Sequence, residues 1–402
     1  MVEGDGTEAQ QLAMRILLKV AEALGAAELL DISGAHIDSC LYHGLAGLDF
    51  AERLAAGGGE VAVPTTLNVT SFDLLHPDLE RGDAANAAQA RRLVDAYVSM
   101  GGRPTWTCAP YQLEARPGLG DQVAWGESNA IVFANSVLGA RTERYGDFTD
   151  ICAALTGRAP AGGLHLDAGR RGGIVFDVSG LPDAVLGGDV IFAVLGHLVG
   201  FHAGRRVPVI VGLPAATEDQ LKAFGAGAAS SGAVAMFHAV GITPEAPTLA
   251  ATGAADAPVV AVSLEDIERA RRDLSTVATG TLGGVAMGTP HASGSQLADI
   301  ADLFGSDHVA PNVVCSVNTG RDVLAASGAA VQLQAAGVEL VTDTCTYLKP
   351  IMAVPPGAVV MTDSAKWAYY APANIGVDVV FASTADCVAS AISGEITRVV
   401  GW

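Results

Sequence analysis

Three of the six cysteines stand where their sulfur atoms could reach a ligand. Cys108 and Cys345 each follow a short apolar run that predicts a strand, and polar residues surround both of them. Cys387 falls in the first turn of a predicted helix, where the positive end of the helix dipole favours a thiolate. Three separate cysteines can hold an iron–sulfur cluster with one iron left open, which acts as a Lewis acid toward a hydroxyl group. Cysteines in a crevice could instead act as nucleophiles, or they could have no chemical role.

The spacing of other residues supports no second kind of metal or nucleotide site. The chain has no Cys-x-x-Cys pair, no zinc-type histidine spacing and no glycine-rich phosphate loop after a strand. Cys152 and Cys315 lie inside apolar runs and are expected in the core. A lone histidine, such as His36 or His291, is expected to make a structural hydrogen bond.

Arginines gather in one part of this acidic chain. Arg141, Arg144, Arg170 and Arg171 fall within about 30 positions, although the whole chain has only 23 lysines and arginines. Guanidinium groups bind carboxylates in a bidentate manner, so this cluster is compatible with an anionic substrate. Surface ion pairs with neighbouring acidic residues explain the same pattern.

The segment from Pro104 to Arg144 combines a cysteine, two tryptophans, a carboxylate and several amides between short apolar runs. Buried polar groups need partners, so such a segment often lines a site. A hydrogen-bonded loop that joins two elements has a similar composition. The residues alone leave both interpretations open.

The elements that would position these residues alternate between helix and strand. The expected helices include 8–25, 84–100, 150–156, 293–304 and 384–392, and the expected strands include 27–32, 61–63, 105–107, 207–211, 284–287 and 359–362. This alternation predicts an α/β protein with several α/β/α subdomains and mostly parallel sheets, whose ligands lie at the carboxyl ends of the strands. Alanine, glycine and proline dominate 241–258, which predicts two regions, 1–245 and 246–402.

Composition narrows the class of partner and the compartment. A net charge of −20 and a pI near 4.7 disfavour binding to nucleic acid or to an acidic membrane. The longest apolar run, 190–201, is shorter than the roughly 18 residues that span a bilayer. The N-terminus lacks the basic and apolar segments of a signal peptide, so a cytoplasmic protein is expected.

Several longer motifs, in order along almost the whole chain, resemble one family. They are Ile32-Ser33-Gly34-Ala35-His36-Ile37, Val63-Pro64-Thr65-Thr66-Leu67-Asn68, Thr107-Cys108-Ala109-Pro110-Tyr111, Ala124-Trp125-Gly126-Glu127-Ser128-Asn129-Ala130, Asn135-Ser136-Val137-Leu138-Gly139-Ala140-Arg141-Thr142, Thr243-Pro244-Glu245-Ala246, Pro290-His291-Ala292-Ser293, Asp343-Thr344-Cys345 and Lys366-Trp367-Ala368-Tyr369-Tyr370-Ala371-Pro372. Together they resemble the catalytic large subunit of aconitase X.

The resemblance implies a dehydratase of the aconitase superfamily with an iron–sulfur catalytic region. Bacterial members act on cis-3-hydroxy-L-proline and archaeal members on mevalonate 5-phosphate. The family's catalytic unit also includes a small swivelling domain, for which the matched motifs leave no room. A separate small partner subunit, which carries the catalytic base, is therefore implied.

Roles follow from the matched positions. The resemblance implies Cys108, Cys345 and Cys387 as cluster ligands and Ser33, His36, Glu127 and Lys366 as catalytic residues. It implies that the substrate is bound by Thr65, Asn68, Ser128, Asn129, Arg141, Thr142 and Arg170, with Arg141 and Arg170 on its carboxylate. Thr289 stands where many relatives are expected to have cysteine, so the cluster could be altered or absent.

Three functions remain open at this stage. Dehydration of cis-3-hydroxy-L-proline is favoured, because a phosphorylated substrate such as mevalonate 5-phosphate would need a second basic cluster. A scaffold homologue that has lost the cluster is compatible with Thr289. A cysteine hydrolase is disfavoured, since no histidine is placed by sequence to activate Cys108 or Cys345.

Overall fold

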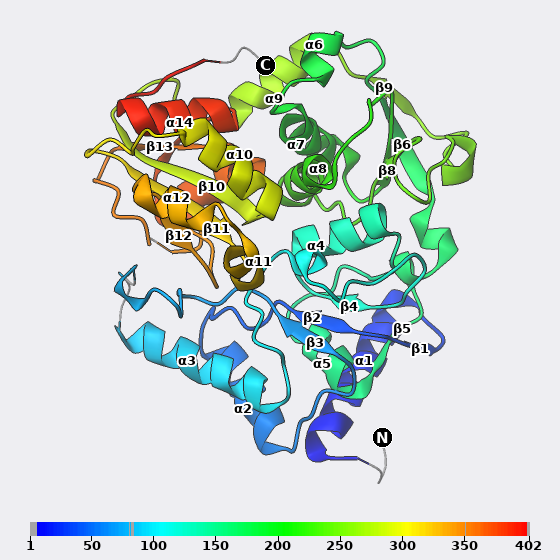
Figure 1. Cartoon of the computed structure of the whole chain (residues 1–402). Helices are drawn as coiled ribbons and strands as arrows, with labels where there is room; N and C mark the ends of the chain where they lie inside the picture. Colours follow the sequence, from blue (N-terminus) through cyan, green and yellow to red (C-terminus); the bar gives the residue numbers. More distant parts are fainter. Residues whose placement is uncertain (1–5, 80, 82–83, 350, 400–402) are drawn as a thin grey trace.

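The computed structural model describes residues 6–79, 81, 84–349 and 351–399 of the chain. It confirms an α/β fold of mostly parallel sheets, arranged as three regions around a common centre (Figure 1). The first region lies at the bottom of the view, the second at the upper right and the third at the upper left.

The first region, residues 6–168, is built on a small parallel sheet with the order β3-β2-β4. Its strands are β2 (Ala35–Ile37), β3 (Thr65–Leu67) and β4 (Ala124–Trp125), and an antiparallel pair joins β1 (Leu29–Asp31) to β5 (Arg158–Pro160). The helices are α1 (Glu8–Leu24), α2 (Leu45–Ala56), α3 (Ala84–Ser99), α4 (Ser128–Phe133) and α5 (Thr149–Thr156). Thr7 and Gln10 form a capping box at the start of α1, as the sequence predicts.

The second region, residues 172–273, holds a parallel sheet with the order β8-β7-β6-β9. Its strands are β6 (Gly172–Asp177), β7 (Val207–Val211), β8 (His238–Ala239) and β9 (Val259–Ala261), and its helices are α6 (Asp183–Leu186), α7 (Ile191–Ala203), α8 (Glu218–Ser231) and α9 (Leu264–Asp273). The expected boundary after residue 245 falls inside this sheet, because β9 pairs with β6. Residues 241–258 therefore join two elements of one region.

The third region, residues 282–399, is a five-stranded parallel sheet with the order β12-β11-β10-β13-β14. Its strands are β10 (Leu282–Ala292), β11 (Val314–Thr319), β12 (Glu339–Val341), β13 (Val359–Thr362) and β14 (Asp378–Phe381). The helices are α10 (Gly294–Phe304), α11 (Arg321–Ala326), α12 (Ala330–Ala335), α13 (Ala365–Ile375) and α14 (Thr384–Ser393).

One apolar cluster connects the three regions at their meeting point. It includes Cys108 from the first region, Phe176 from the second, and Cys345 and Trp367 from the third. All four side chains are buried. The regions are therefore held against one another by a shared core, which fixes the relative positions of the residues at the centre. No helix in the described part of the chain combines the length and the apolar character that a membrane span requires.

Candidate active site

A compact group of side chains that could bind a metal lies at this centre. Ligand atoms of Cys108, His291 and Cys345 all lie within 4.8 Å of one another, and all three residues are buried. Cys108 lies in a loop of the first region, His291 is near the end of β10, and Cys345 follows β12. The residues 105–107 before Cys108 are not a strand as expected, but the two thiols do meet as candidate ligands.

The hydrogen bonds of His291 leave one ring nitrogen able to bind a metal. Nε2 lies 3.1 Å from the carbonyl oxygen of Thr344, which can only accept, so this nitrogen carries the proton. Nδ1 then accepts from the hydroxyl of Thr107 at 3.1 Å. Release of that hydroxyl would free the Nδ1 lone pair. The backbone N–H of His291 also donates to Cys108 Sγ at 3.3 Å.

The two thiols differ in their protonation. Burial alone would raise the pKa of Cys108, but a hydrogen bond from Cys345 and the nearby His291 and Lys366 lower that pKa to about 6. The same hydrogen bond, together with burial, raises the pKa of Cys345 well above its usual value. Cys108 is thus the first of the pair to become a thiolate, the form that binds metals.

A buried ion pair lies beside the metal group. Lys366 Nζ is 2.5 Å from Glu127 Oε1, and both side chains are almost fully buried. Burial would lower the pKa of Lys366, but the Glu127 carboxylate outweighs it and raises that pKa. Lys366 is in the first turn of α13, where Ser364 accepts a hydrogen bond from the Trp367 N–H. The ammonium group is therefore retained in a site that excludes water.

Glu127 is fixed by the start of α4. Its side chain caps that helix by accepting from the Ala130 N–H at 2.7 Å, and Ser128 and Asn129 also donate to the carboxylate. Asn129 donates in addition to the Cys108 carbonyl at 2.9 Å and accepts from the Tyr111 hydroxyl. The helix start thus ties the carboxylate to the loop that carries Cys108.

His36 and Asn68 offer unused polar atoms at the same centre. His36 is completely buried on β2, with Nδ1 2.8 Å from the Thr66 hydroxyl. Its Nε2 and the Asn68 Oδ1 make no hydrogen bond of good geometry among the described residues, although Asn68 is close enough to the ring to raise its pKa. Burial lowers the pKa of His36 to about 4 against the opposing effect of Glu127, so the ring is neutral. A buried unpaired atom costs free energy, so these atoms are candidates to contact substrate.

Asp38 is a candidate that the sequence analysis did not single out. Its carboxylate accepts from the Asn68 amide. Burial and then the neighbouring carboxylates Glu127, Asp147 and Asp150 raise the pKa of Asp38 to about 8. It directly follows the matched motif Ile32 to Ile37, which is the signal that could have identified it. A pKa so far from its usual value, in a polar centre, is typical of a functional group.

Other predicted residues support the backbone in this structure. The Ser33 hydroxyl donates to the Gln122 carbonyl, and the Thr65 hydroxyl donates to the Val63 carbonyl. Thr142, fully buried, accepts from the Trp125 N–H at 3.0 Å. These contacts shape the loops around the centre, and substrate contacts by Ser33, Thr65 and Thr142 stay predictions.

Arg170 is directed at protein groups in this structure. All of its N–H groups meet protein acceptors, namely Glu245, Asn135 and the carbonyls of Leu164, Asn135 and Ala140. Arg141 bonds the His165 carbonyl and Asp167. These contacts join the first two regions and favour a structural role for Arg170, and its contact with the substrate carboxylate stays a prediction.

Cys387 is likewise separated from the metal group. It is buried in the core of the third region, with Cys315 and Asp363 among the groups that raise its pKa after burial itself. Thr289 lies near His291 in the chain, but its hydroxyl accepts from Asn318 at 3.1 Å. The third candidate ligand that the described residues bring to Cys108 and Cys345 is His291, and its spacing in the sequence does not indicate it.

Replacement of Arg170 by methionine is expected to destabilise the fold by about 3 kcal/mol, because Glu245 and several carbonyls lose a buried partner. KM is expected to stay within about twofold. Urea unfolding and steady-state kinetics measure the two effects. Arg141→Met is the matched control and should cost less than about 1 kcal/mol, because its partner Asp167 is exposed. A raised KM with normal stability would restore Arg170 as a substrate ligand.

Comparisons with known proteins agree with this arrangement of regions. Models of the aconitase X first, second and third domains match residues 1–168, 174–272 and 283–393. The crystal structure of aconitase X from Thermococcus kodakaraensis, in its holo form, superposes with a TM-score of 0.86 at 28% identity and covers 97% of each chain.

Characterised relatives fall into two groups. The chain is 44% identical to cis-3-hydroxy-L-proline dehydratase from Pseudomonas aeruginosa, over 98% of this chain and 69% of the relative. It is 40% identical to the cis-3-hydroxy-L-proline dehydratase from Hypocrea jecorina, over 100% of this chain and 69% of the relative. It is 36% identical to the phosphomevalonate dehydratase large subunit from Methanothermobacter thermautotrophicus, over 95% of this chain and 94% of the relative. With three matched domains and these identities over nearly its whole length, the chain belongs to the aconitase X family of dehydratases.

Proposed function

We propose that this chain catalyses the removal of water from cis-3-hydroxy-L-proline. The observation that carries the proposal is the buried Cys108–His291–Cys345 group with the Lys366–Glu127 ion pair beside it. The two hydroxyproline dehydratases, at 44% and 40% identity, support this substrate over phosphomevalonate, whose dehydratase is 36% identical.

The donor set fits an iron–sulfur cofactor. Two cysteine sulfurs and one imidazole nitrogen are soft and intermediate donors that suit iron–sulfur centres, and all three residues are buried. Cys108, Cys345 and, after release of the Thr107 hydroxyl, His291 would hold the group. When bound, the cofactor supplies a Lewis acid toward the hydroxyl of the substrate.

The ion pair supplies a proton for the leaving group. Loss of water breaks the C–O bond at carbon 3 and the C–H bond at carbon 2, and the hydroxide leaves as water if it receives a proton. Lys366, held as an ammonium by Glu127, is the donor that we assign to this step. The proton from carbon 2 passes to a base that we place on a small partner subunit. The enamine product then tautomerises to pyrroline-2-carboxylate.

Asp38 is assigned to the ring nitrogen of the substrate. Hydroxyproline carries a secondary ammonium group, and a carboxylate beside the unpaired Asn68 Oδ1 and His36 Nε2 would bind it. Asp38, Glu127, Asp147 and Asp150 are close enough to interact electrostatically. A phosphate would add negative charge to this acidic group, whereas an ammonium group would reduce it. This charge favours the hydroxyproline substrate over mevalonate 5-phosphate.

The pH dependence of substrate affinity tests this role. Since the pKa of Asp38 is about 8, binding of a cation below pH 8 must expel a proton, so KM is expected to fall about tenfold per pH unit between pH 6 and pH 8. Asp38→Asn should raise KM about tenfold or more at pH 8 and remove most of this slope. Steady-state kinetics over that range measure both effects.

Stability of the free protein provides the control for that experiment. A carboxyl group with a raised pKa stabilises the fold when protonated, and that contribution is lost as the pH rises from about 4 to about 8. Asp38→Asn should therefore raise the melting temperature at pH 8 but not at pH 4. An unchanged KM slope in a variant with this stability signature would remove Asp38 from the substrate site.

The proposed partner is a small subunit that completes the catalytic unit. The match spans 69% of the hydroxyproline dehydratases but 94% of a relative whose name marks it as a large subunit. The two groups thus differ in how much protein lies outside the matched part. A separate chain with the remaining portion is expected to bind this one and to provide the base.

The decisive experiment combines the two chains without oxygen. The chain is reconstituted with iron and sulfide, mixed with the small-subunit candidate and assayed with cis-3-hydroxy-L-proline and with mevalonate 5-phosphate. Pyrroline-2-carboxylate is the expected product. Turnover of mevalonate 5-phosphate but not of cis-3-hydroxy-L-proline would indicate a phosphomevalonate dehydratase instead. Absence of iron, with hydroxyproline binding unaffected by Cys108→Ser, would indicate a scaffold.

A further inference from the structure

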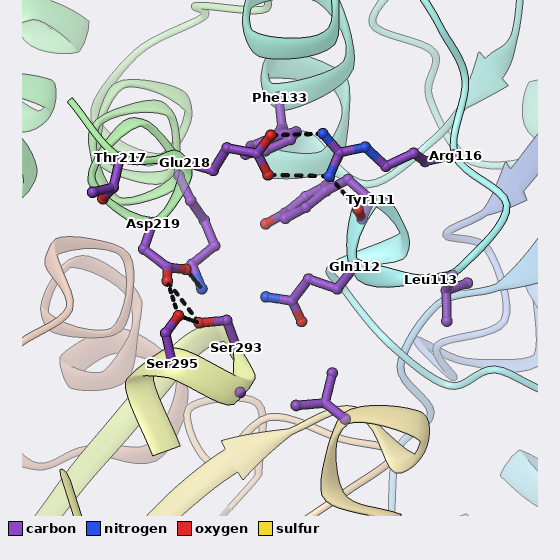
Figure 2. Close-up of a pocket in the computed structure, with 13 residues that line it drawn as sticks. Tyr111, Gln112, Leu113, Arg116, Phe133, Thr217, Glu218, Asp219, Ser293 and Ser295 are labelled. Carbon is purple, nitrogen blue, oxygen red and sulfur yellow. Dashed lines mark hydrogen bonds and ion pairs between the residues drawn. The ribbon is translucent and has the colours of Figure 1, made fainter. Parts of the chain in front are cut away.

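A cavity of about 430 Å³ opens where the three regions meet (Figure 2). Each region contributes a polar side chain to its wall, with Gln112 from the first, Lys222 from the second and Ser293 from the third. At one side of the cavity the guanidinium of Arg116 faces the Glu218 carboxylate in a bidentate pair. None of the three candidate metal ligands lines this cavity, but its wall touches the backbone of one of them.

Lys222 is a buried cation whose ion-pair and hydrogen-bond partners are protein groups. Its side chain is only 3% exposed, although it belongs to α8 near the edge of the cavity. Nζ pairs with Asp219 Oδ1 at 2.8 Å, donates to Gln296 Oε1 at 2.5 Å and donates to the carbonyl oxygen of His291 at 3.2 Å. Burial of a charge costs free energy that these contacts offset, so the ammonium is held at one place.

Asp219 extends the same contact to the start of α10. Its Oδ2 accepts from the hydroxyls of Ser293 and Ser295 at 2.7 and 2.8 Å (Figure 2). Ser293 is also the N-cap of α10, in a capping box with Gln296. Burial would raise the pKa of Asp219, but Lys222 and the serines lower it, so the carboxylate is ionised. The Lys222–Asp219 ion pair of the second region thus holds the turn that follows His291 in place.

The first region also forms a hydrogen bond to the backbone carbonyl of His291. Gln112 Nε2 donates to the His291 carbonyl at 3.1 Å, so this oxygen accepts one hydrogen bond from each of the other two regions. The N–H of the same residue donates to Cys108 Sγ. His291 is therefore held from both sides of its backbone, directly beside the two thiols.

We propose that Lys222, with Asp219 as its counter-ion and Gln112 as its partner, is a positioning residue for His291 in the metal group. It sets the distance between the imidazole and the two sulfurs by fixing the His291 carbonyl between the three regions. This inference rests on the proposed metal site. It assigns to the cavity wall a role in metal retention, without contact to substrate.

The test compares two variants of the same cavity. Lys222→Met keeps most of the length of the side chain and removes its charge, and Arg116→Met removes a cation that does not contact His291. In the reconstituted two-chain enzyme, Lys222→Met is expected to accelerate release of iron to a chelator by about 10- to 100-fold, as for other residues that orient metal ligands. Arg116→Met is expected to stay within about twofold of wild type.

A purely structural role would give a different pattern. The melting temperature of Lys222→Met should fall further in the metal-loaded form than in the metal-free form, because the loss acts through metal binding. An equal loss in both forms, with unchanged iron release, overturns the proposal. If Lys222→Met does not fold, Gln112→Met removes the other hydrogen bond and should accelerate release at least about fivefold. Wild-type protein that never binds iron would sink the proposed function and this inference together, whereas unchanged release from iron-loaded variants sinks this inference alone.

Discussion

Serine in place of Cys108 or Cys345 is expected to abolish iron retention and to lower kcat by roughly a thousandfold or more, about 4 kcal/mol of transition-state stabilisation. A serine hydroxyl stays protonated where a thiol can ionise, so the ligand atom is lost while the shape of the side chain is kept. Iron and sulfide content, the visible absorption band and anaerobic kinetics measure the effect. Full iron content in Cys345→Ser would contradict the proposed ligand set.

Cys387→Ser is the matched control, and it also decides between the sequence-based ligand set and the structural one. Cys387 is packed in the core of the third region, so its replacement should leave iron content unchanged. A hydroxyl in that apolar position should lower the free energy of unfolding by roughly 1 to 2 kcal/mol. Iron loss in a folded Cys387→Ser chain would show that this thiol reaches the cluster after all.

Lys366→Met is expected to lower kcat by roughly 100- to 10,000-fold, because the leaving hydroxide loses its proton donor. Iron content should remain at the wild-type value, which separates this effect from that of the cysteine variants. The change also leaves the Glu127 carboxylate buried without its partner, at a stability cost of about 3 to 5 kcal/mol.

A double-mutant cycle resolves the two effects of Lys366. Glu127→Gln combined with Lys366→Met removes the unpaired charge, so the double variant should be more stable than Lys366→Met alone. Its kcat should stay low, because neither change restores a donor. Recovery of kcat together with stability would show that the ion pair only supports the fold.

Much of the fold could be predicted from local patterns. Amphipathic periodicity and caps predict α1, α3, α10 and α14 nearly to the residue, since these signals depend on nearby positions alone. In the first region β1 lies inside the expected strand 27–32, but β3 is at Thr65–Leu67 in place of 61–63 and residues 105–107 form no strand. Strand pairing is decided by partners far away in the chain, which also explains why β9 belongs to the second region.

A residue of the candidate site could be predicted only where its neighbours in the sequence indicate its role. Cys108, Cys345, Glu127 and Lys366 are in motifs that resemble the family, and the structure brings them together. His291 is in a matched motif too, but its spacing indicates no relation to either thiol, because Cys108 and His291 meet only in the folded chain. The structural contacts of Arg170 could not be predicted either, since a sequence cannot show that protein acceptors already meet every N–H of a guanidinium group.

The assembly of the candidate metal group from the first and third regions also determines when it can form during synthesis of the chain. His291 follows Cys108 by 183 positions, so at a usual rate of synthesis the first thiol precedes the imidazole by roughly 10 to 40 s, and Cys345 arrives later still. The three candidate ligands therefore cannot be gathered before Cys345 has been made. Under the proposed function, iron would be loaded only after that point, when synthesis of the first region that carries Cys108 is long complete.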